Sequence, residues 1–158
     1  MTMSSAGREA LDEALSRLPH GPGFRFVDRV LTLEPGKRGT GEYKVLGSEP
    51  FLAGHFPGDP LFPGVLLIEA CAQLAGVVAQ SDPDHGALPR LKLAAVRGSK
   101  IMGSARPGEV ITLHAEVSGR MGHLIQAKAS ASVLGALVLQ CELTLAGAPS
   151  TRTEPRPG

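Results

Sequence analysis

Apolar residues recur along the chain with two different periods, and the changes between them predict the order of helices and strands. Leucines near the N-terminus repeat at helical spacing, which predicts a helix over 7–18 that Pro19 ends. Residues 64–80 are apolar on almost every side, which predicts a buried helix. Elsewhere the period is two, which predicts strands. The predicted strands span 24–33, 38–46, 91–102, 110–117, 124–133 and 137–145.

The late strands carry apolar side chains on one face only. In 110–117, for example, Ile111, Leu113 and Ala115 alternate with polar residues. These faces need a cover, and the helix at 64–80 is the one element apolar almost all round. We therefore expect an α+β fold, with a curved antiparallel sheet wrapped around a central helix.

The length of 158 residues fits one domain with a real core. We expect a flexible or helical segment over 1–14, a single domain over 15–147, and a disordered tail over 148–158, where prolines and polar residues gather. Proline and glycine signals predict loops at 47–63 and 81–90.

Charge and cysteine usage exclude several functional classes. The net charge of +1 gives no global reason to expect nucleic acid or an anionic membrane as a partner. The longest apolar stretch, 65–79, is too short to cross a bilayer, and no secretory signal pattern opens the chain. Cys71 and Cys141 lack metal-ligand spacing, so we expect no metal and interpret both as reduced packing residues of a cytoplasmic protein, with a disulfide as the alternative.

A single carboxylate interrupts the apolar helix. Glu69 is the only charged residue in 64–80, and Gln73 lies about 40° from it on a helical wheel. A solvent-facing helix edge would usually carry several charges in i,i+4 pairs, so that alternative fits less well. Apolar surroundings favour the protonated carboxyl, which suits a proton donor, and Gln73 can hydrogen-bond it.

The loop before this helix supplies a candidate base and a candidate oxyanion donor. His55 opens a segment that three prolines stiffen, and Gly64 begins the helix, where the N–H groups have no internal acceptor. With Glu69, these groups fit removal of a proton next to a carbonyl and loss of a protonated leaving group. The alternative for His55 is a structural hydrogen bond.

The segment GHFPGDPLFPGVLLIEACAQLAG, at 54–76, resembles the signature of the 3-hydroxyacyl–acyl carrier protein dehydratases of fatty acid synthesis. The resemblance extends to LPH at 18–20, FVDRVLTLEPGKR at 26–38 and RPGE at 106–109, and it covers about 15–146. It implies the hot-dog fold and conversion of 3-hydroxyacyl thioesters to trans-2-enoyl thioesters without a cofactor.

Carried over by position, the resemblance implies that His55 is the base, Glu69 the acid, Gly64 the donor to the thioester carbonyl and Gln73 the support of Glu69. The site would form in a homodimer, with His55 of one subunit facing Glu69 of the other, and dimers would assemble further into trimers of dimers. The residues implied in the acyl tunnel are Phe56, Phe62, Val65 and Ile68. Acyl carrier protein is the implied partner, and the basic residues that could dock it, or else be plain surface, are Arg90, Lys92, Arg97 and Lys100.

The sequence also departs from the family. The strand before RPGE reads VRGSKIMGSARPGE and lacks the aromatic residue of the family's usual basic–aromatic cluster. The family's lid over the acyl tunnel, and the chain-length preference that depends on it, are therefore not expected to carry over directly. Three rival functions remain open. A dehydratase–isomerase usually has aspartate where this chain has Glu69, a thioesterase would need a water-activating carboxylate, and a non-catalytic acyl-binding subunit would need neither His55 nor Glu69.

Overall fold

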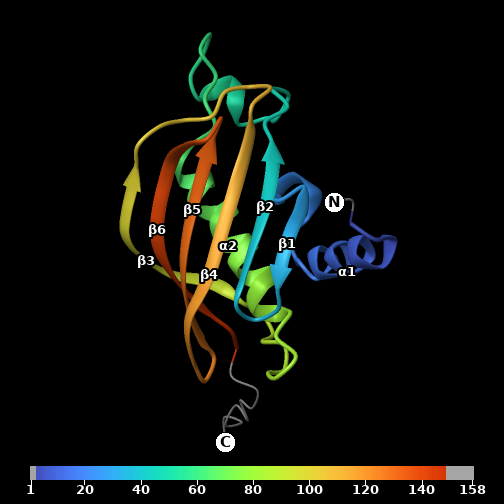
Figure 1. Cartoon of the computed structure of the whole chain (residues 1–158). Coiled ribbons are helices and arrows are strands. Elements are labelled where there is room, and N and C mark those ends of the chain that lie inside the picture. The colour runs from blue at the N-terminus through green and yellow to red at the C-terminus, as the bar shows by residue number, and fades with distance from the viewer. Residues whose placement is uncertain (1–2, 149–158) are drawn as a thin grey trace, which may run out of the picture.

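A six-stranded antiparallel sheet curves around one long helix in the computed structural model of the chain, which describes residues 3–148 (Figure 1). The helices are α1 (Ser5–Ser16) and α2 (Gly64–Gln80), and short 3-10 turns cover Pro22–Phe24 and Leu52–Gly54. The strands are β1 (Arg29–Glu34), β2 (Arg38–Lys44), β3 (Lys92–Ile101), β4 (Val110–Met121), β5 (Leu124–Val133) and β6 (Ala136–Ala146). The predicted α+β architecture is confirmed.

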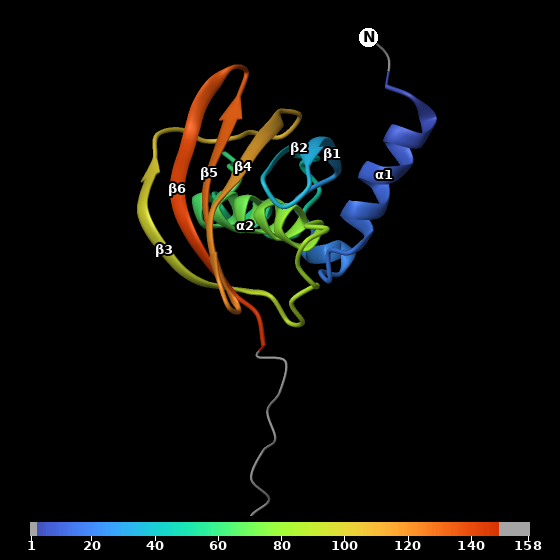
Figure 2. The same cartoon turned by 60° about the horizontal axis from the view of Figure 1, so that its bottom comes forward.

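The strand order is β1-β2-β4-β5-β6-β3, so β1 and β3 form the two edges of the sheet. The view in Figure 2 shows α2 lying in the concave side of the sheet, with α1 outside, next to β1. The edge strand β3 is exposed along nearly its whole length, and only Leu93 is partly covered. One edge of the sheet therefore presents a long row of backbone groups and side chains to the outside.

The core forms where α2 meets the sheet. The helix has the bounds that the apolar run predicts, and Leu67, Leu74 and Val78 on it are fully buried. The thiols of Cys71 on α2 and Cys141 on β6 are both buried and free, in agreement with their interpretation as packing residues.

The late strands follow the predicted alternation, with one exception. The buried residues of β5 are those of the predicted apolar face, from Ile125 to Val133. In β6, however, Leu137 is exposed, although it was expected on that face. Ala131 pairs with Leu139 and Ser132 with Leu137, so Val138 is an extra residue in β6, and it is buried in place of Leu137. Such a bulge reverses the faces of the residues before it.

The predicted strand over 24–33 is wrong in its first half. β1 begins only at Arg29, after the 3-10 turn at Pro22–Phe24. The reason lies in α2: the Gln73 side chain donates to the Phe24 carbonyl oxygen and accepts from the Phe26 N–H, both at 2.8 Å. These backbone groups are therefore bonded to the helix and are not available to a neighbouring strand.

The N-terminal helix packs on the same core. It begins earlier than predicted because the Ser4 hydroxyl accepts from the Gly7 N–H at 3.1 Å and caps the first turn. Leu11, Ala14 and Leu15 are its buried residues. Of the tail predicted at 148–158, residues 149–158 lie outside the described residues. Among residues 3–148, no helix is long and apolar enough to cross a membrane.

Candidate active site

His55 lies in a tightly bonded loop just before α2. Its backbone N–H donates to the Leu52 carbonyl at 3.1 Å, and its own carbonyl accepts from the Leu61 N–H at 2.7 Å. The loop is also tied to the segment before β4, because the Phe62 N–H donates to the Ala105 carbonyl at 2.8 Å. The backbone around His55 is therefore held in one conformation by contacts on both sides.

The His55 ring has a defined orientation. Its Nδ1 lies 3.0 Å from the Leu61 carbonyl oxygen, and the ring stacks on Phe56 with centroids 4.3 Å apart. A carbonyl oxygen can only accept, so Nδ1 carries the hydrogen in this contact. The lone pair of the neutral imidazole is then on Nε2, which is the form that a base requires.

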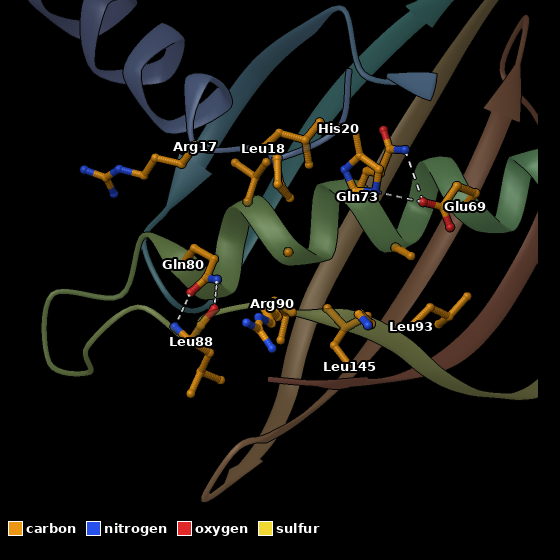
Figure 3. A pocket seen from close by; sticks show the side chains of 16 residues that line it. Arg17, Leu18, His20, Glu69, Gln73, Gln80, Leu88, Arg90, Leu93 and Leu145 are labelled. Carbon is orange, nitrogen blue, oxygen red and sulfur yellow. Dashed lines mark hydrogen bonds and ion pairs between the residues drawn. The ribbon is translucent and has the colours of Figure 1, made fainter. Parts of the chain in front are cut away.

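Glu69 lies in the second turn of α2, and its side chain is only 20% exposed. Two donors contact its Oε1 oxygen: Gln73 Nε2 at 3.2 Å and His20 Nε2 at 3.3 Å (Figure 3). The hydrogen bond expected between Gln73 and Glu69 is therefore present. Gln73 itself is 2% exposed, so the amide that holds Glu69 is part of the core.

A cavity of about 610 Å³ opens beside these three polar side chains (Figure 3). Its walls come from α2, from the end of α1 and the turn after it, from the start of β3 and the loop before it, and from β6. Half of the sixteen lining residues have apolar side chains, and these are Leu18, Pro19, Ala72, Val77, Leu88, Leu91, Leu93 and Leu145. This size is typical of small-molecule sites, which combine apolar walls with a few fixed polar groups. Among residues 3–148, no three His, Cys, Asp or Glu side chains gather as metal ligands would.

Within one chain, the predicted catalytic groups do not line one common cavity. Glu69 and Gln73 line the cavity, whereas His55 and Gly64 do not. Gly64 is the first residue of α2, so its N–H has no acceptor within the helix. The side of Gly64 that lacks a Cβ is covered by Ile101 of β3, whose Cδ1 lies 2.8 Å from where a Cβ would be.

The residues implied in an acyl tunnel lie in different surroundings. Phe62 is 1% exposed and packs edge-to-face on Phe26 and Phe51 in the core. Phe56 and Val65 are among the exposed large apolar residues, at 54% and 70%. Ile68 is partly buried against the core. None of these four side chains lines the cavity beside Glu69.

His20 is the site residue that sequence reasoning missed. It appeared there only as the last letter of LPH at 18–20, as part of the resemblance. A histidine directly after the proline that ends a helix was the available signal. Its contact with Glu69 spans almost fifty residues of sequence and depends on the packing of α2 beside the turn after α1.

Comparisons with known proteins identify the family of this chain. Residues 18–142 match the FabA-like domain family. A 3-hydroxyacyl–acyl-carrier-protein dehydratase FabZ from Chloroflexus aggregans is 36% identical over 137 residues, which is 87% of this chain and 94% of the relative. The dehydratase of the same name from Anaeromyxobacter sp. is 38% identical over 147 residues, covering 90% of this chain and 93% of the relative.

Solved structures show the same fold at lower identity. The dehydratase heterocomplex ApeI:P from Xenorhabdus doucetiae has a TM-score of 0.72 at 16% identity, with 86% of this chain and 91% of that chain covered. Zebra fish thioesterase superfamily member 2 has a TM-score of 0.65 at 16% identity, covering 93% and 100%. These neighbours confirm the hot-dog fold, and the sequence relatives identify the family. The chain belongs to the FabA-like domain family, among its 3-hydroxyacyl–acyl-carrier-protein dehydratases.

Proposed function

We propose that this protein dehydrates 3-hydroxyacyl thioesters, linked to acyl carrier protein, to trans-2-enoyl thioesters in fatty acid or related lipid biosynthesis. The observation that carries the proposal is Glu69, a single carboxyl group that two side chains hold at the wall of an apolar cavity. Relatives that are 36–38% identical over most of this chain are named as dehydratases of this kind.

In the proposed reaction, Nε2 of His55 removes the proton from C2 of the substrate. The Gly64 N–H, at the positive end of the α2 dipole, stabilises the negative charge that develops on the thioester oxygen. Glu69 gives a proton to the C3 hydroxyl, which leaves as water. The C2–H electron pair becomes the new double bond, so no redox cofactor or metal takes part.

The complete site would require two copies of the chain, as a homodimer that can assemble further into a trimer of dimers. His55 and Glu69 do not share a cavity in one chain, so a second copy would bring His55 to Glu69. The exposed edge strand β3 supports this arrangement, because Val96 and Ile101 on it are exposed apolar residues. Phe56 and Val65, also exposed, would then line the channel together with Ile68.

The proposed partner is acyl carrier protein, and the proposed location is the cytoplasm. Arg90 and Lys92 lie at the cavity that holds Glu69, and Arg97 and Lys100 lie further along the exposed β3. Cations in these positions would attract an acidic carrier to the mouth of the site. The two free, buried cysteines are typical of a reducing compartment.

Enoyl absorbance, measured with purified protein and 3-hydroxyacyl thioesters on the carrier and on coenzyme A, tests the activity. We expect His55→Ala and Glu69→Gln each to remove most of the rate while circular dichroism stays unchanged. Wild-type rates in both variants would refute the assigned roles. Release of a free thiol without enoyl product would identify a thioesterase, and binding without either product a non-catalytic subunit.

Mixing the two inactive variants tests the shared site. If each site takes His55 from one copy and Glu69 from the other, half of the randomly formed dimers contain one intact site. Co-expression should then restore about a quarter of the wild-type activity. A site contained in one chain would give no recovery.

A further inference from the structure

Two donors converge on one oxygen of the Glu69 carboxyl group, and none of the contacts within residues 3–148 reaches the other oxygen. Gln73 Nε2 and His20 Nε2 lie 3.2 and 3.3 Å from Oε1. Figure 3 shows both groups on the same side of Glu69, with His20 coming from the turn after α1. The carboxyl group is therefore held asymmetrically, with Oε2 left for another partner.

The amide of Gln73 can be oriented in only one way. Its Oε1 accepts from the buried Phe26 N–H, so its NH₂ group must face the Phe24 carbonyl and Glu69. Both of its N–H bonds are used in these two contacts. The backbone of 24–26 thus fixes the position of Gln73 Nε2, which donates to Glu69.

His20 is held from the same segment. Its ring stacks on Phe24 at an interplanar angle of 26°, with centroids 6.2 Å apart, and Pro19 restricts the chain before it. Its Nδ1 is buried and has no partner among the described residues. A protonated imidazole would leave a buried N–H at Nδ1 without an acceptor, which is costly. The geometry favours neutral His20 with its hydrogen on Nε2, donating to Glu69.

From these contacts we propose that His20 is a positioning residue for Glu69 and that Oε2 is the oxygen that exchanges a proton with the substrate. The inference rests on the proposed dehydratase function. Because Oε1 already accepts two N–H donors, the proton of the carboxylic acid is carried by Oε2. After Oε2 gives that proton to the C3 hydroxyl, the same two donors stabilise the anion at Oε1. His20 itself touches neither C2 nor C3.

Two substitutions separate positioning from a structural role. His20→Phe keeps a ring that can stack on Phe24 but removes the donor, whereas His20→Gln places an amide N–H near the position of Nε2. We expect His20→Phe to lower kcat about 10- to 100-fold with little change in KM, because misplacing a reacting group costs rate more than binding. His20→Gln should recover much of that loss. His85→Phe is the matched control, since His85 pairs with Asp82 away from the cavity, and it should behave as wild type.

The pH profile and a spectroscopic measurement complete the test. Both limbs of the wild-type profile should persist in His20→Phe, because the acid and the base remain. In protein labelled with carbon-13 at glutamate carboxyls, His20→Phe should shift the Glu69 signal without substrate, and His20→Gln should shift it less. An unshifted signal overturns the contact, whether or not the protein is active.

Activity results separate this inference from the function on which it rests. If the wild type is active and His20→Phe leaves kcat unchanged, only the positioning role of His20 is refuted, and the dehydratase function stands. Equal loss in His20→Phe and His20→Gln, together with a lower Tm in both, would make the residue structural and would also overturn the proposal. An inactive wild type refutes the dehydratase function, and the carbon-13 shift then decides whether His20 positions Glu69.

Discussion

Gly39 and Gly41 lie on β2 where the neighbouring atoms leave little room for a Cβ, and Gly41 supports a sharp stability prediction. A Cβ added at Gly41 would lie 2.9 Å from the Arg29 carbonyl oxygen, 3.2 Å from Val27 Cγ1 and 3.4 Å from Leu74 Cδ1. The first of these atoms belongs to the backbone at the start of β1, which is paired with β2. Gly41→Ala therefore requires β1 and β2 to move apart at this point, since a backbone carbonyl cannot move away as the end of a flexible side chain could.

The magnitude follows from two opposing effects. Relieving the contact at Gly41 demands a movement of about half an ångström in a packed core, and overpacking of this kind typically costs about 1–3 kcal/mol. Replacing glycine by alanine also lowers the conformational entropy of the unfolded chain, which stabilises the folded state by about 0.4–1 kcal/mol. The net destabilisation should be about 1–2 kcal/mol. Gly119 of β4 is the matched control, because its nearest atom would be Gln126 Oε1 at 3.8 Å. Gly119→Ala should be neutral or slightly stabilising.

Urea denaturation at one fixed protein concentration measures both variants, because an associating protein gains apparent stability with concentration. We expect the midpoint to fall for Gly41→Ala and to stay or rise for Gly119→Ala, with equal m-values. If Gly41→Ala is as stable as Gly119→Ala, the close approach of the Arg29 carbonyl oxygen of β1 to Gly41 is not a constraint in solution, and the argument from packing fails.

Three further predictions concern a turn, a carboxylate and the thiols. Leu134 has φ +51° and is 91% exposed, so Leu134→Asn should stabilise the protein by about 1 kcal/mol in urea denaturation, and a loss would contradict this. Desolvation opposes ionisation of Glu49, but hydrogen bonds from neighbouring backbone N–H groups and the Tyr43 hydroxyl outweigh it and lower its pKa. Its contribution to stability is therefore complete above the unfolded-state pKa and is lost as the pH falls through the lowered folded-state pKa. The stability difference between wild type and Glu49→Gln should shrink from pH 7 to below about pH 4, and a constant difference would refute this. The Cys71 thiol donates a hydrogen bond to Cys141, and this bond together with burial raises the pKa of Cys71, so Cys71 should react with a thiol reagent only after unfolding in guanidinium, and immediate labelling of the native protein would disprove it.

The pattern of the sequence determined the elements that depend on local periodicity. The apolar run at 64–80 specifies α2, because a helix covered by a sheet on several sides needs apolar residues around most of its surface. The alternation at 124–133 specifies β5 for the corresponding reason, since one face of that strand is buried. The Glu69 candidate and the Gln73 contact also follow from sequence, because positions i and i+4 on a helix are neighbours.

Only the tertiary structure decided the features that depend on distant partners. Residues 24–28 look like the start of a strand, yet the side chain of Gln73, almost fifty residues away, bonds the backbone of Phe24 and Phe26, and β1 begins only at Arg29. The same packing brings His20 to Glu69, and it covers Phe62 with other aromatic rings although its neighbour in the motif, Phe56, is exposed. Periodicity reports which face of an element is buried. It carries no information on which distant side chain lies opposite, because that depends on how whole elements pack together.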